Sequence, residues 1–104
     1  MTDRLETLRK FLEEDPSDPF NRYALALEYV SRRDFSASAK LFEEVIGMHP
    51  DYIPAYQQLG MLMKELGRTD RAKSVLEEGV RRAVAAGDGH AAAEMREMID
   101  ETGV

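Results

Sequence analysis

The chain repeats itself every 34 residues, and this interval limits its fold more than any other feature. Residues of the same type recur at this spacing in three places: Pro16 and Pro50, Leu25 and Leu59, and the acidic pairs Glu43-Glu44 and Glu77-Glu78. Leu8 precedes Phe42 by the same interval, so the repetition begins before the first complete unit. A fixed period of about 20 to 50 residues is typical of arrays whose small units must stack to bury their apolar faces. The sequence therefore predicts a stack of similar units.

Apolar residues recur at spacings of three and four, which places them on one face of a helix, and no stretch alternates as a half-buried strand would. The first segment, residues 3–13, is an amphipathic helix by this criterion, and its apolar positions are Leu5, Leu8, Phe11 and Leu12. The chain predicts an all-α protein with about six helices, over residues 3–13, 18–31, 35–48, 52–66, 70–86 and 90–101.

Start and stop signals separate these helices. Asp18 is placed to cap the second helix, and Pro19 suits its first position because the missing N–H would be unpaired there. The third helix is expected to end at Gly47 and Pro50. The fifth helix should be longer than the third, since Val84 stands where Pro50 ended the earlier one.

The turn before the fifth helix has its own signals. Gly67 is suited to a left-handed backbone conformation, and either Thr69 or Asp70 can cap the helix that follows. The run Gly87-Asp88-Gly89 then ends the fifth helix and precedes the last one.

The repeated positions resemble the tetratricopeptide repeat, in which W-x2-L-G-x2-Y lies on a first helix and A-x3-F lies on a second, before a proline. The first unit offers Arg22, Leu25, Ala26, Tyr29, Ser38, Phe42 and Pro50 at these positions. The second offers Tyr56, Leu59, Gly60, Met63, Ala72, Leu76 and Val84. Small residues at Ala26, Gly60 and Ala72 are expected where helices approach closely. Arg22, Ser38 and Val84 depart from the pattern.

The resemblance implies one domain, residues 1–104, built as a short right-handed α-solenoid of helix-turn-helix repeats. Residues 3–15 would form a leading half-repeat helix and residues 17–50 the first full repeat. Residues 51–86 would form the second repeat, and residues 88–101 a C-terminal capping helix.

The resemblance also implies a function, because the family binds peptides or protein segments on a concave face lined by the first helix of each repeat. On a helical wheel, the candidate groove residues lie opposite the motif side of these helices: Phe20, Tyr23, Leu27, Gln57, Gln58, Met61 and Lys64. Apolar anchors in such grooves carry most of the binding energy, and polar groups add hydrogen bonds. The protein is therefore expected to be a non-catalytic interaction adaptor.

Other interpretations of the same residues stay open. Tyr23 and Leu27 could pack against the leading helix or the next unit, and Gln57 and Gln58 could be ordinary solvated surface. The competing function is structural, a self-associating module whose apolar inner face is buried in a homodimer. Family members that grip the carboxylate end of chaperone tails use Lys, Asn and Arg side chains on this face. Lys64 alone is a poor clamp, so binding of chaperone tails is not expected.

Composition excludes several other functions. A net charge of −6 argues against a nucleic-acid partner, which needs clustered Lys and Arg. No apolar run approaches the ~18 residues that span a bilayer. The amino terminus lacks the apolar core of a signal peptide, so no membrane partner and a cytoplasmic location are expected. There are no cysteines.

Catalytic and metal sites are not expected either. His49 and His90 are the only histidines, and neither has a second histidine at helical spacing. The recurring acidic pairs lie on the polar side of second helices, which favours solvated surface over acid–base chemistry. There is no glycine-rich phosphate loop, so no cofactor and no enzymatic activity are predicted.

Overall fold

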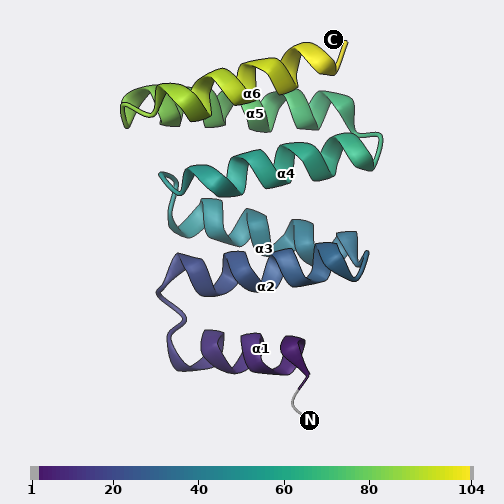
Figure 1. Ribbon diagram of the computed structural model, residues 1–104, viewed down its shortest axis with the longest axis vertical. Helices are drawn as coiled ribbons and strands as arrows, with labels where there is room; N and C mark the ends of the chain where they lie inside the picture. The colour runs from purple at the N-terminus through teal and green to yellow at the C-terminus, as the bar shows by residue number, and fades with distance from the viewer. Residues whose placement is uncertain (1–2, 104) are drawn as a thin grey trace. The chain divides into compact units, whose positions relative to one another are not determined.

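The computed structural model describes residues 3–103, and within this range every regular element is a helix. The helices are α1 (Arg4–Glu14), α2 (Pro19–Ser31), α3 (Phe35–Met48), α4 (Ile53–Glu65), α5 (Thr69–Ala85) and α6 (Gly89–Glu101). Figure 1 shows the short turns that join successive helices. The predicted all-α repeat class is confirmed. The fifth helix is longer than the third, as expected, with 17 residues against 14.

Contacts divide the chain into two compact units, one ending at His49 and one beginning at Pro50. In the first unit, α2 packs against both α1 and α3. In the second unit, α5 packs against both α4 and α6, and α4 also contacts α6. The predicted boundaries of the half-repeat, the two repeats and the cap stay a prediction, as does the right-handed superhelix.

Aspartates cap four of the six helices, because a carboxylate can accept a hydrogen bond from the unpaired N–H groups of the first turn. The capping residues are Asp3, Asp18, Asp34 and Asp88. Asp18 accepts from the backbone N–H of Phe20 at 3.0 Å, with Pro19 in the first turn as predicted. The third helix runs through Gly47 to Met48 and ends before Pro50. Its end is therefore set by the proline and not by the glycine.

The predicted cap of α5 is wrong. Neither Thr69 nor Asp70 occupies the cap position, which belongs to Arg68, and no side chain makes a capping hydrogen bond there. The preceding turn decides this outcome. Gly67 adopts a left-handed conformation with φ of 75°, and the Arg68 N–H donates to the Met63 carbonyl at 2.8 Å. This closure places Thr69 as the first helical residue, one position too late to cap.

In the described residues, three turns place a left-handed residue directly before the N-cap residue of the next helix. Only one of them has both glycine at the left-handed position and aspartate at the cap. A left-handed residue followed by the cap residue stands at Arg33-Asp34, Gly67-Arg68 and Gly87-Asp88. Glycine adopts positive φ without steric cost, whereas Arg33 has a φ of 62°, a conformation that brings its Cβ close to the backbone. The first turn therefore lacks the glycine, and the second lacks the aspartate.

Most motif positions of the two repeats lie in the core. Ten of the fourteen residues at these positions are buried: Leu25, Ala26, Ser38, Phe42, Tyr56, Leu59, Gly60, Met63, Ala72 and Leu76. Ser38 is polar yet fully buried, and its hydroxyl donates to the Phe35 carbonyl at 3.0 Å. This bond removes the cost of burying an unpaired hydroxyl.

Arg22 stands where an aromatic residue is expected, and it makes the same kind of hydrogen bond to a proline carbonyl as Tyr56 makes in the second repeat. Its Nη1 donates to the carbonyl oxygen of Pro16 at 2.5 Å, and the hydroxyl of Tyr56 donates to the carbonyl oxygen of Pro50 at 2.6 Å. The two pairs are separated by one repeat length. Arg22 also pairs with Glu44 at 3.3 Å, so this acidic residue, predicted to be solvated surface, is half-buried in an ion pair.

Two glycines of the second unit allow close helix packing. A Cβ added to Gly60 in α4 would lie 2.6 Å from Cγ of Leu76 in α5, which confirms the predicted close approach. A Cβ added to Gly79 in α5 would lie 2.7 Å from Cβ of Tyr56 and 2.5 Å from the sulfur of Met95. The role of Gly79 was not predicted from the sequence.

The leading helix α1 has no buried residue. Leu5, Leu8 and Leu12 are half-buried, whereas Phe11 is 49% exposed. The prediction that Phe11 belongs to the same apolar face as the three leucines is therefore wrong. None of the described helices is both long enough and apolar enough to cross a bilayer.

Candidate functional site

Three candidate residues lie on α2 in the first unit. Phe20 is 58% exposed, while Tyr23 and Leu27 are half-buried. The Tyr23 ring meets the buried Phe42 ring edge-on, with 5.8 Å between centroids. Tyr23 therefore contributes to packing within its own unit, and Phe20 offers the most accessible aromatic surface of the three.

The other four candidate residues lie on α4 in the second unit. Met61 is 49% exposed and Lys64 is exposed, whereas Gln57 and Gln58 are half-buried. Of these, Met61 and Lys64 line a common hollow, and the two glutamines do not.

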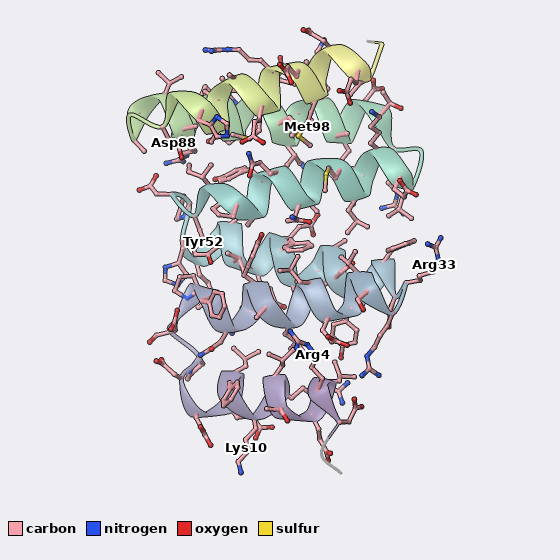
Figure 2. The ribbon with its side chains drawn as sticks, in the orientation of Figure 1. Arg4, Lys10, Arg33, Tyr52, Asp88 and Met98 are labelled. Atoms are coloured by element: carbon pink, nitrogen blue, oxygen red, sulfur yellow. The ribbon has the colours of Figure 1, made fainter. Side chains whose placement is uncertain are left out.

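This hollow has a volume of about 530 Å³ and is lined by all three helices of the second unit. Four residues from two successive turns of α4 contribute to its wall: Gly60, Met61, Lys64 and Glu65. Leu76 of α5 contributes apolar surface, and Met98 and Glu101 of α6 complete the lining. Figure 2 shows the Met98 side chain directed from α6 toward the helices beneath it.

The local sequence explains the apolar lining of the hollow. Gly60 has no side chain, so the end of Leu76 fills the space that a Cβ would occupy. The neighbouring wall consists of the flexible thioethers of Met61 and Met98, which can adapt to different apolar groups. The centre of the hollow is therefore apolar and adaptable.

Charged residues surround this apolar centre. Lys64 Nζ lies 3.3 Å from Oε2 of Glu101, and both side chains are largely solvated, so the pair contributes little to stability. Glu65 forms no ion pair within residues 3–103. The lining thus holds one positive and two negative side chains.

The sequence reasoning missed the contribution of α6. The helical wheels of the first helices do not include residues of α6, so they do not indicate that Met98 and Glu101 line the hollow. The available signal was their spacing of three residues, which places both on one face of a helix expected to follow α5.

Neither histidine belongs to a cluster. Nε2 of His90 lies 3.0 Å from Oε1 of Glu94 on an exposed part of α6. Among the described residues, no group of three His, Cys, Asp or Glu side chains could hold a metal ion.

The sequence profile of the tetratricopeptide repeat family matches residues 29–95, which is more than half of the chain. The chain belongs to the tetratricopeptide repeat family. The match includes the end of α2 and all of α3, α4 and α5, and it ends at Met95 within α6.

Solved structures agree with this assignment. The chain is 36% identical to a tetratricopeptide repeat domain protein from Salinibacter ruber, with a TM-score of 0.81, and the alignment covers 85% of this chain and 89% of that one. Its fold also resembles that of a protein from Bordetella parapertussis, with a TM-score of 0.84 at 21% identity and coverage of 99% of this chain and 90% of that one, which supports the fold alone.

A third structure is the TPR2B domain of yeast Sti1 in a complex described as containing pHsp70. Its TM-score is 0.89 at 13% identity, with coverage of 95% of this chain and 79% of that one, so it supports the fold alone. No curated protein sequence matches this chain.

Proposed function

We propose that this tetratricopeptide repeat protein is a non-catalytic adaptor that binds a segment of another protein. The observation that carries the proposal is the hollow between α4 and α6, with its apolar centre and polar rim. Apolar side chains of a partner would gain free energy by leaving water there, and the family assignment makes a protein partner the expected ligand.

Met61 and Lys64 are proposed to contact the ligand in the second unit, and Phe20, Tyr23 and Leu27 in the first. Gln57 and Gln58 are proposed as hydrogen-bonding groups beside them. Met61 and Phe20 are the strongest candidates, since each exposes about half of a large apolar side chain to water.

The proposal is tested by selecting binding peptides from a displayed random library and measuring their affinity by fluorescence polarisation. Met61→Asp should weaken a selected peptide at least tenfold, because it places a charge in the apolar contact. Met48→Asp is the matched control, since Met48 is also 49% exposed but lies in the first unit, outside the hollow.

Two results would contradict the proposal. The first is the failure of the folded wild-type protein to enrich any peptide. The second is equal weakening by Met61→Asp and Met48→Asp, which would place binding elsewhere. Thermal melting of both variants checks that each remains folded.

Self-association is a second candidate function, and the exposure of Phe20 favours it. Phe20 is 58% exposed, and it shares one face of α2 with the half-buried Leu27, so a second copy could cover this face. Sedimentation at micromolar concentration should then show a dimer that Leu27→Asp dissociates. A monomer that binds selected peptides would rule this candidate out in favour of the adaptor.

A further inference from the structure

Resting on the proposed function, we infer that the hollow of the second unit binds a segment that combines a large apolar side chain with a nearby Lys or Arg. An acidic chain terminus is the wrong ligand for it. The apolar residue would enter between Met61 and Met98, and the basic residue would meet the acidic rim.

The first argument is the charge of the lining. Glu65 and Glu101 outnumber Lys64, and the Lys64 ammonium already faces the Glu101 carboxylate at 3.3 Å. A ligand carboxylate would have to displace Glu101 from this ammonium and would also face the carboxylate of Glu65. A ligand cation would instead find Glu65, which has no ion-pair partner within residues 3–103.

The second argument is the direction of the helices. Lys64 and Glu65 lie in the last turn of α4, and Met98 and Glu101 lie in the last turn of α6. The unpaired carbonyls at a helix C-terminus carry partial negative charge, which favours cations within that turn. Leu76 lies beyond the first turn of α5, so the positive end of α5 offsets this effect little.

The apolar lining explains why charge selects the ligand while apolar contact provides most of the affinity. Met61, Met98 and Leu76 offer a surface that can adapt to an aliphatic or aromatic side chain. The rim charges are exposed to water, so their contribution is screened by salt and is modest for each pair. We therefore expect an absolute requirement for the apolar residue and a graded preference for the basic one.

The composition of peptides selected from a displayed random library tests this inference. Peptides that bind through the hollow, identified by loss of binding to Met61→Asp, should be enriched in a large apolar residue with Lys or Arg within about one helical turn. Enrichment of acidic peptides that still need Met61 would overturn the inference and leave the adaptor function standing. If no peptide is enriched, the adaptor function fails and the inference fails with it.

Charge reversal gives a second, independent readout. Glu65→Lys should weaken a selected basic peptide roughly five- to tenfold, and should strengthen the same peptide with its basic residue changed to Glu. Glu77→Lys is the matched control, because Glu77 is an exposed residue of α5 outside the hollow. Equal effects of the two reversals would mean that only the overall charge matters, and would overturn the inference.

Other occupants give different results. A peptide with a free acidic C-terminus that binds more tightly than its amidated form would identify a carboxylate as the ligand. A wild-type dimer that Met61→Asp dissociates would identify a second copy of the chain as the occupant. Either result would overturn the inference.

Discussion

Substituting alanine for Gly79 tests the close packing of the second unit. The added Cβ would lie 2.7 Å from Cβ of Tyr56 in α4 and 2.5 Å from the sulfur of Met95 in α6. Met95 can move its flexible side chain away, but the Cβ of Tyr56 is attached to the backbone of α4. The ring of Tyr56 is also held at its far end, where its hydroxyl donates to the Pro50 carbonyl at 2.6 Å. The two helices must therefore separate to accept the methyl group.

The expected magnitude is a balance of two effects. Alanine is favoured over glycine in a helix interior by about 1 kcal/mol. Overpacking a tight core costs about 1–3 kcal/mol, and the contact with a fixed Cβ places Gly79→Ala toward the upper end of that range. We expect a net loss of about 1–2 kcal/mol in the free energy of unfolding. The melting temperature should fall by about 5–10 °C in a domain of this size.

Gly47→Ala is the matched control, because Gly47 lies in α3 and nothing surrounds the position of its missing Cβ within 4 Å. Only helix propensity acts there, so the free energy of unfolding should rise by up to about 1 kcal/mol. Thermal and urea unfolding, followed by circular dichroism, measure both variants. A similar stabilisation by Gly79→Ala and Gly47→Ala would refute the close approach of α5 to Tyr56.

Three further substitutions test the turns and the core. Arg33→Gly should raise the free energy of unfolding by about 1 kcal/mol, because it removes the strain of a positive φ, and a lower melting temperature would contradict this. Arg68→Asp should stabilise α5 by about 1 kcal/mol in urea titrations by supplying the missing carboxylate cap, as Asp34 does for α3, and an unchanged midpoint would show that the cap position is misassigned. Gly60→Leu should cost about 1–3 kcal/mol by overpacking against Leu76, and an unchanged melting temperature would be incompatible with the observed packing.

The fold could be predicted because each level of the sequence indicates the same structure. The 34-residue period, the helical spacing of apolar residues and the prolines at helix boundaries are local signals that do not depend on tertiary contacts. The error at the start of α5 has the opposite origin. Thr69 and Asp70 both have capping side chains, but the left-handed turn at Gly67 fixes which residue takes the cap position.

The candidate site was less predictable because it depends on contacts between helices that are distant in the sequence. A helical wheel places Met61 and Lys64 on one face of α4 but does not show which residues of other helices meet them. Met98 and Glu101 join them only because α6 folds back against α5 and touches α4. Arg22 shows the same limitation, since its bond to the Pro16 carbonyl replaces a tyrosine hydroxyl by a different chemical group.

Nuclear magnetic resonance of the methionine methyl groups tests the central claim most directly. The chain has six methionines, of which Met61 and Met98 line the hollow and Met48 is equally exposed outside it. On titration with a peptide selected for binding, the methyl resonances of Met61 and Met98 should shift together with one dissociation constant, while that of Met48 stays unchanged. A shift of the Met48 resonance with Met61 and Met98 unaffected would contradict binding in the hollow of the second unit.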